Sequence, residues 1–383
     1  MQDDHQNNQG RRSFVLGGTA AGLGLTGLGL SSTASSTASS TASSTAISAT
    51  ANAGSGTSSA LRAAAGEGKG KTPLAEVVMS EHWASKPVDG GAVRLYLRRK
   101  RLRRAVTTPR GTVLFVHGSS VSATPVYDLQ IPARPESSVM DWYARLGYDT
   151  WCVDCEGYGR SEKSRAINAD IACGADDLAA ASAEISRITG EKKLLLYGSS
   201  SGALRAALFA QRHPERVARL ALDAFVWTGE GSPTLANRRK RLDEYRANNR
   251  RPIDRAFVHS IFTRDHPGTS DLTVVDAFAD AVLALDNSVP TGTYVDMSAN
   301  LPVVDPLKIS VPVLILRGQW DGIASEQDLG NFFFKLPNPD KQFVIMPGIA
   351  HTSTRSKNWR LVYHLLDGFF SQPAPVYTGQ HSA

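Results

Sequence analysis

The sequence has few cysteines, three in 383 residues, which excludes a four-cysteine metal site and a disulfide-rich fold. Cys152 and Cys155 are spaced as C-x-x-C, but they lie where an expected strand runs into a loop. Cys173 supplies no second pair that would complete a redox or metal site. We therefore interpret the three as buried or loop cysteines, which can form at most one disulfide.

Long apolar runs and a strong excess of one charge are also missing. No uninterrupted apolar stretch can span a membrane as a mature helix, and the net charge of +6 is too modest to indicate a nucleic-acid partner. We find no metal-ligand cluster, Walker loop or dinucleotide-binding loop in the sequence, so no cofactor and no metal are expected. The composition, 42% hydrophobic and 20% charged, is that of a globular protein.

The first 53 residues differ in composition from the rest. Arg11 and Arg12 precede a short apolar stretch and a Gly-rich run, which is typical of a twin-arginine export signal. Residues 31–46 repeat SSTA, a tract expected to be disordered, and Ala51-Asn52-Ala53 fits an A-x-A cleavage site. We predict a leader over 1–53, a flexible segment over 54–75, and a protein that is periplasmic or secreted.

Strand and helix patterns alternate through the rest of the chain. Short apolar runs end in turns, and segments with helical spacing lie between them. Strands are expected over 92–102 (at the sheet edge), 111–118, 148–154, 192–198, 217–225, 311–318 and 341–348, and helices over 139–147, 176–190 and 201–214. This alternation predicts an α/β fold with a mostly parallel central sheet covered by helices on both faces.

Three consecutive serines follow the expected strand over 192–198, and a helix follows them. Only Ser200 has glycines at both −2 and +2, which gives G-x-S-x-G between a strand and a helix. In this context the middle side chain projects above the sheet as a nucleophile. The N–H of Ser201, at the start of the helix, then becomes an oxyanion donor.

A nucleophilic serine needs a base and an orienting acid, and α/β sheets of this kind carry them in the order Ser, Asp, His. His351 follows the last expected strand, and Asp321 follows the strand before it. Each residue alone is a weak signal because surface histidines and turn aspartates are common. Together, in this order, they predict a triad of Ser200, His351 and Asp321.

These motifs resemble the α/β-hydrolase superfamily, in particular its branch of capped esterases, carbon–carbon bond hydrolases and dehalogenases. The similarity covers about residues 93–370 and includes "VHGSS" at 116–120, "DCEGYGRS" at 154–161 and "HPERVARLAL" at 213–222. Glu156 departs from the pattern because arginine is common at that position. The resemblance implies that the N–H of Ser119 is the second oxyanion donor.

The resemblance leaves the triad acid open. In part of the superfamily the acid follows the strand that here ends at Asp223, and we favour Asp321 because G-x-x-D after the penultimate strand is the commoner arrangement. The dehalogenases and epoxide hydrolases of the superfamily use aspartate as nucleophile, so Ser200 points away from their reactions.

A long insertion interrupts the strand pattern after residue 226. It is too long for an ordinary loop and has helical stretches, which predicts a cap over residues 227–306 between core segments 76–226 and 307–383. Caps of this kind form substrate pockets. Trp227, Tyr127 and Trp320 are candidate pocket walls, although each could equally belong to the core.

Two basic runs, 94–104 and 238–241, allow two interpretations. Either run could attract an anionic substrate or surface. The interpretation we favour from sequence is that edge-strand charges block aggregation and helix charges face water.

The sequence thus favours an exported serine hydrolase. Among serine hydrolases it favours a carboxylic-ester hydrolase that acts on a small-molecule ester. A carbon–carbon bond hydrolase or an acyltransferase would use the same residues. A non-catalytic α/β fold that binds a small ligand is the alternative from another class. Neither the acyl and alcohol specificity nor the oligomeric state is readable from the sequence.

Overall fold

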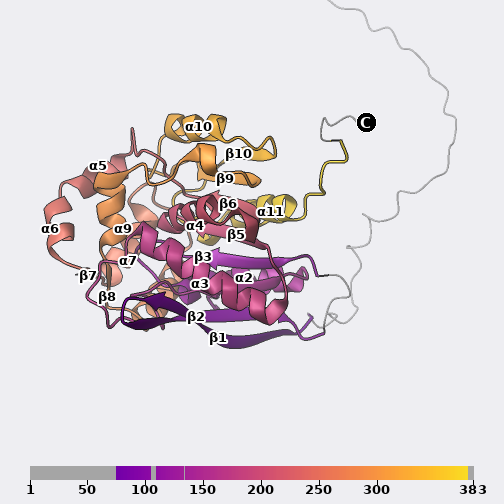
Figure 1. Ribbon diagram of the computed structural model, residues 1–383. Coiled ribbons are helices and arrows are strands. Elements are labelled where there is room, and N and C mark those ends of the chain that lie inside the picture. Colours follow the sequence, from indigo (N-terminus) through magenta and orange to yellow (C-terminus); the bar gives the residue numbers. More distant parts are fainter. Residues whose placement is uncertain (1–74, 105–108, 133, 378–383) are drawn as a thin grey trace, which may run out of the picture. The chain divides into compact units, whose positions relative to one another are not determined.

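A computed structural model describes residues 75–104, 109–132 and 134–377 (Figure 1). The predicted leader over 1–53 lies outside the described residues, and so do residues 54–74 of the predicted flexible segment. None of the described helices combines the length and the apolar character needed to cross a membrane.

Eight strands form one central sheet in the order β1-β2-β4-β3-β5-β6-β9-β10. Only β2 runs against its neighbours, and the other pairings from β4 to β10 are parallel. The strands are β1 (Val77–Val88), β2 (Gly91–Leu102), β3 (Thr112–Val116), β4 (Asp149–Val153), β5 (Leu194–Ser199), β6 (Val217–Asp223), β9 (Val313–Gly318) and β10 (Lys341–Met346). The predicted mostly parallel α/β sheet is confirmed.

The edge of the sheet differs from the expectation. β2 was expected at the edge, but it pairs with β4 on one side and with β1 on the other. β1 escaped prediction because most of its side chains are exposed or half-buried, so it lacks a clear apolar period.

Helices cover both faces of the sheet, and the side chains of β3 show how the faces divide. Leu114 and Val116 face the cluster that contains α3, α4 and α10, whereas Val113 and Phe115 face the cluster that contains α2, α8 (Leu272–Leu283) and α11. The core helices are α1 (Ala123–Tyr127), α2 (Val139–Arg145), α3 (Ile171–Thr189), α4 (Ser201–Arg212), α10 (Glu326–Lys335) and α11 (Trp359–Phe370). Two apolar clusters, one on each face, therefore pack against the sheet.

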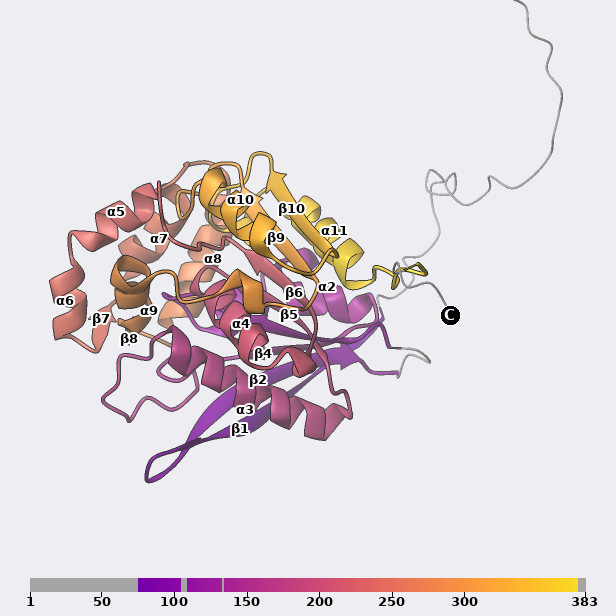
Figure 2. The ribbon, with the colours of Figure 1, turned by 45° about the horizontal axis from the view of Figure 1, so that its top comes forward.

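The insertion between β6 and β9 is largely helical. It contains α5 (Pro233–Arg239), α6 (Leu242–Ala247), α7 (Arg255–Thr263), α8 (Leu272–Leu283) and α9 (Gly292–Val295), with a small hairpin of β7 (Arg250–Pro252) and β8 (Ser288–Pro290). Figures 1 and 2 both place α5, α6, α7 and α9 together at one end of the sheet. A helical insertion therefore precedes the penultimate strand, as expected, while the domain limits at 227 and 306 stay a prediction.

Candidate active site

The turn between β5 and α4 holds Ser200 in a conformation that L-residues rarely adopt, with φ 59° and ψ −126°. The flanking glycines make this turn possible. A Cβ on Gly198 would lie 2.4 Å from the carbonyl oxygen of Gly202, and a Cβ on Gly202 would lie 2.2 Å from that of Val116. Backbone packing thus demands glycine at both positions, which is the physical reason for the G-x-S-x-G spacing.

The structure brings Ser200, His351 and Asp321 into one hydrogen-bonded chain. Nε2 of His351 lies 3.2 Å from Oγ of Ser200, and Nδ1 lies 2.9 Å from Oδ1 of Asp321. Because an ionised carboxylate only accepts hydrogen bonds, Nδ1 must donate, which leaves Nε2 of a neutral imidazole free to accept a proton from Ser200.

The carboxyl group of Asp321 is buried yet favours its charged form. Burial alone would raise its pKa, but the charge and hydrogen bond of His351 and the N–H of Ile323 hold the pKa below the ordinary value. A carboxylate that stays ionised beside an imidazole can orient the ring and stabilise its positive charge.

The alternative acid, Asp223, has other partners. Its carboxylate accepts hydrogen bonds from the hydroxyl groups of Tyr197 and Ser353, and its backbone carbonyl accepts one from the N–H of Ser200. Burial raises the pKa of Asp223 to about 6, against those two hydroxyl donors, which lower it. Among the described residues, His351 makes its carboxylate contact with Asp321 and not with Asp223.

The two expected oxyanion donors lie beside Ser200. Gly118, which precedes Ser119, is so close that an added Cβ would stand 3.2 Å from Cβ of Ser200. Ser201 is the first residue of α4, so its N–H has no acceptor within the helix. The backbone N–H of Ser119 donates to no described residue.

A buried histidine fixes the turn that carries Ser119. Nε2 of His117 accepts a hydrogen bond from the N–H of Cys155, and Nδ1 lies 2.8 Å from the carbonyl oxygen of Gly118. Burial and the nearby Arg205 lower the pKa of His117 to about 3, so the ring is neutral and Nδ1 donates. The carbonyl of Ser119 is held from the other side by the hydroxyl of Tyr158.

A cavity opens at Ser200, and its walls differ in part from the expectation. Val121, Val126, Ile261 and Phe278 line it together with His351. Ile261 and Phe278 come from α7 and α8, so the insertion covers Ser200 at the carboxyl ends of the parallel strands.

The three aromatic residues proposed as pocket walls have different positions. Tyr127 is fully buried and donates to the carbonyl of Val116, and Trp227 packs on Phe332 and donates to a carbonyl, so neither lines the cavity at Ser200. Trp320 stacks on His266 and lines a neighbouring cavity. Aromatic residues near strand ends serve both core and cavity, and their type alone does not separate the two.

The cavity has charged walls, of which Arg238 belongs to a run considered from sequence as a possible anion attractor, whereas Arg264 and Arg355 were not predicted. Arg238, Arg264 and Arg355 line the cavity at Ser200, and the described residues that line it include no aspartate or glutamate. Arg238 belongs to a run that was expected to face water, and the signal that could have identified it is its place on the predicted cap.

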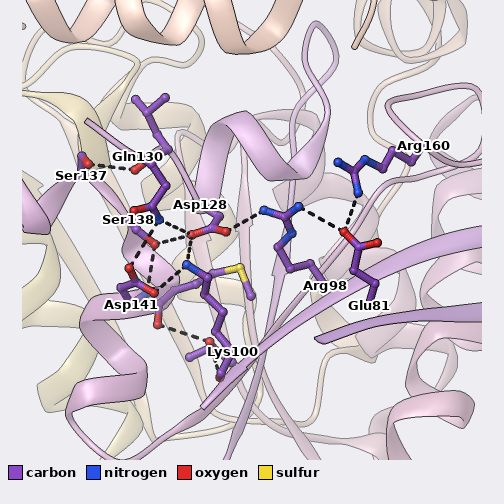
Figure 3. A network of polar contacts seen from close by, with 12 residues as sticks. Glu81, Arg98, Lys100, Asp128, Gln130, Ser137, Ser138, Asp141 and Arg160 are labelled. Carbon is purple, nitrogen blue, oxygen red and sulfur yellow. Dashed lines mark hydrogen bonds and ion pairs between the residues drawn. The ribbon is translucent and has the colours of Figure 1, made fainter. Parts of the chain in front are cut away.

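The other basic run also departs from the expectation. Lys100 on β2 is 8% exposed, and its Nζ lies 2.5 Å from Asp128 and 2.7 Å from Asp141. Arg98 reaches Asp128 at 2.8 Å in the same network (Figure 3). Lys100 and Arg98 do not face water because Asp128 and Asp141 lie against them. Part of the run is exposed as expected, namely Arg94, Arg101, Arg103 and Arg104.

Two groups of side chains have the donor types of a metal site, but their donors are engaged. Asp265, Asp321 and His351 lie close together, and the last two are bonded to each other. Glu156 and Asp177 surround the ammonium group of Lys86, which lies 2.6 Å and 2.5 Å from their oxygens. This ion pair also accounts for the glutamate at position 156, because it offsets the buried charge of Lys86.

Comparison with known proteins places these features in a family. The profile of the family described as "serine aminopeptidase, S33" matches residues 107–357. A search of curated protein sequences finds no significant match.

Solved structures share the fold at low identity. A thermophilic esterase from Thermogutta terrifontis with malate bound has 20% identity and a TM-score of 0.56, covering 76% of this chain and 99% of that one. A 2-hydroxy-6-oxo-6-phenylhexa-2,4-dienoate hydrolase from Rhodococcus sp. strain RHA1 has 16% identity and a TM-score of 0.54, covering 77% of this chain and 99% of that one. A monoacylglycerol lipase from Paleococcus ferrophilus has 17% identity and a TM-score of 0.52, covering 72% of this chain and 98% of that one.

Proposed function

This chain belongs to the serine aminopeptidase S33 family of α/β hydrolases, and we propose that it is a serine esterase that cleaves carboxylic esters through an acyl-enzyme. The observation that carries the proposal is the hydrogen-bonded chain from Oγ of Ser200 through His351 to Asp321 at a strained strand–helix turn.

The reaction follows from the roles of these atoms. Nε2 of His351 takes the proton of Ser200 as Oγ attacks the ester carbonyl carbon, and the N–H groups of Ser119 and Ser201 stabilise the oxyanion. The imidazolium then gives the proton to the departing alcohol as the C–O bond breaks. Water, deprotonated by His351, attacks the acyl carbon, the bond from that carbon to Oγ of Ser200 breaks, and the imidazolium returns its proton to Oγ as the acid is released.

The charge of the cavity supports esters over peptides with a free amino terminus. An aminopeptidase must hold the ammonium group of its substrate, for which a carboxylate is the natural partner. The described residues that line the cavity at Ser200 supply arginines and no carboxylate. A substrate ammonium group beside Ser200 would therefore be repelled, and the carboxylates nearby, those of Asp265 and Glu326, line the neighbouring cavity instead.

A fluorophosphonate probe and serine variants test the proposal. The probe should label the wild type at Ser200, and Ser200→Ala should abolish labelling and lower kcat on a 4-nitrophenyl ester by about 1,000-fold or more. Ser201→Ala is the matched control, because its hydroxyl has no hydrogen-bond partner among the described residues and its backbone N–H is retained. Labelling and turnover that survive in a folded Ser200→Ala variant would refute the mechanism.

Export by a twin-arginine route is a second part of the proposal. It rests on Arg11, Arg12 and the following apolar and Ser/Thr/Ala-rich residues of the leader. Replacing both arginines by lysine should retain the protein in the cytoplasm in cell fractionation. Unchanged export of that variant would contradict this route without touching the esterase proposal.

A further inference from the structure

We propose that the cavity at Ser200 accepts an anionic ester, one with a free carboxylate on its acyl or its alcohol part, and that Arg238 and Arg264 bind this carboxylate. The inference rests on the proposed function, because Ser200 acts on the same ligand. It adds a substrate class and two residues that determine specificity.

The arginines that line the described part of the cavity have few carboxylate partners. Within the described residues, no carboxylate oxygen lies within 4.0 Å of a nitrogen of Arg238 or Arg355. Arg264 has one acidic contact, with its neighbour Asp265 at 3.4 Å. The cavity therefore holds more positive than negative charge beside the proposed nucleophile.

A fourth guanidinium lies just behind the wall. Arg251 is 7% exposed and donates to Oγ of Ser120 at 2.7 Å, while its buried Nε has no hydrogen-bond partner among the described residues. The guanidinium carbons of Arg238 and Arg251 each lie 4.1 Å from the centroid of the Tyr294 ring. Both guanidinium groups therefore contact Tyr294, and of the two only Arg238 lines the cavity at Ser200.

The ionisation of Tyr294 reports the resulting field. Burial would raise its pKa, but Arg238, Arg251 and Arg264 lower it to about 7. Burial and the charges of Arg264 and Arg251 also lower the pKa of Arg238 to about 10, with Tyr294 opposing them. A negative charge is therefore favoured at this place in the molecule.

The network on β2 shows one way in which this chain holds a buried cation. Lys100 there contacts two carboxylates, and Arg98 contacts Asp128 (Figure 3). Such partners offset the cost of removing a charge from water. The fully buried Arg205 is held differently, because among the described residues it donates to the carbonyl of His117 and to the hydroxyl of Tyr158 and has no carboxylate within 4.0 Å. Arg238 differs from both, because it is half-buried, lines the cavity at Ser200 and lacks a carboxylate partner among the described residues. A guanidinium binds carboxylate in a planar, two-pronged manner, so a substrate carboxylate in this cavity fits it.

Arg238 and Arg264 also line a second, larger cavity that includes Trp320 and Tyr245. They therefore stand between the space at Ser200 and the space under α5 and α6. The second cavity also carries Asp265, Asp321 and Glu326, so its charge is mixed. The substrate carboxylate is therefore placed at Arg238 and Arg264, between the two spaces, with the ester carbonyl at Ser200.

Two matched pairs of esters test the inference. Mono-4-nitrophenyl glutarate is compared with 4-nitrophenyl pentanoate, and 4-acetoxybenzoate with its methyl ester, so that the charge lies on the acyl part in one pair and on the alcohol part in the other. The wild type should favour the charged member of one pair. Arg238→Gln and Arg264→Gln should each lower the charged-to-neutral ratio of kcat/KM for that pair about tenfold or more, mainly through KM.

Arg246→Gln is the matched control, because Arg246 is an exposed arginine of α6 that lines neither cavity. It should leave the ratio unchanged. A ratio that is the same in the wild type and both cavity variants, for both pairs, would overturn the inference while ester hydrolysis upholds the proposed function.

Binding without catalysis separates the two proposals further. Glutarate should bind to Ser200→Ala in calorimetry and should bind about tenfold or more weakly when Arg238→Gln is added. The bound anion should also raise the pKa of Tyr294 and so reduce phenolate absorbance slightly above pH 7, a signal that Tyr294→Phe removes.

If the wild type cleaves neither ester and Ser200 is not labelled, the esterase proposal fails, and this binding result alone decides whether the anion site exists. No glutarate binding and no change in absorbance would refute the site.

Discussion

The carboxyl ends of β6 and β9 each lead to a buried aspartate, and the pKa values of the two carboxyl groups shift in opposite directions. The pKa of Asp223 rises to about 6, whereas that of Asp321 falls below its ordinary value. Both groups are almost entirely removed from water, at 1% and 2% exposure, so burial cannot explain the difference. The partners explain it.

Asp321 faces an imidazole that can carry a positive charge, and Asp223 faces two neutral hydroxyl groups. A charge opposite a carboxylate offsets desolvation more than a neutral donor does. Ser353, one of the two hydroxyl partners, lies two residues after His351. We infer that Asp223 anchors the loop that carries His351, while Asp321 orients the ring.

Replacing each carboxyl group by an amide gives the largest expected contrast. Asp321→Asn should lower kcat by about 10,000-fold, because an amide can present a donor to Nδ1 of His351 and favour the wrong tautomer. Asp223→Asn should lower kcat far less. Ester hydrolysis at one pH, with folding checked by thermal melting, measures both.

The opposite result would reassign the acid. If folded Asp223→Asn is nearly inactive and Asp321→Asn retains most of its activity, the acid belongs to β6. If both variants are nearly inactive, the two carboxyl groups act as one unit and their separation into orienting and anchoring roles is wrong.

This contrast also marks what could be predicted from sequence. Ser200, His351 and Asp321 each follow an apolar strand, so the parallel sheet brings them to one edge, and local patterns suffice to place them. The choice between Asp223 and Asp321 depended on which side chain meets the imidazole, a contact across neighbouring strands that no local pattern contains. The position of the arginines at the cavity could not be derived from sequence for the same reason. A polar helix such as α5 has the same sequence pattern whether its polar face is exposed to water or lines a cavity.

The free energy of unfolding should depend on pH in opposite directions through Asp223 and Asp321. The pKa of Asp223 is about 6 when folded and near 3.8 when unfolded, so between these values the folded state holds a proton that the unfolded state has lost. The free energy of unfolding therefore decreases as pH rises through this window, by at most roughly 3 kcal/mol. Asparagine does not titrate, so the melting temperature of Asp223→Asn relative to wild type should increase from pH 4 to pH 7.

Asp321 should behave in the opposite way. Its lowered pKa contributes stability that is present above the unfolded value of 3.8 and is lost as pH falls through the folded value. The melting temperature of Asp321→Asn relative to wild type should therefore decrease as pH rises from about pH 3 to pH 5. Parallel trends in the two variants would show that burial, and not the partners, sets both pKa values.

The smallest expected effect comes from the hydroxyl partners of Asp223. Ser353→Ala removes a donor that lowers the pKa of Asp223, so that pKa should rise by about one unit, as the loss of one hydrogen bond to a carboxylate implies. The readout is the pH midpoint of the melting-temperature difference between Ser353→Ala and the double variant Ser353→Ala/Asp223→Asn. Ser356→Ala is the control on the same segment, because its hydroxyl has no hydrogen-bond partner among the described residues, and it should leave the midpoint in place. A midpoint that stays the same in Ser353→Ala would mean that Ser353 does not hold Asp223, and the anchoring role of that aspartate would then lose its link to the His351 loop.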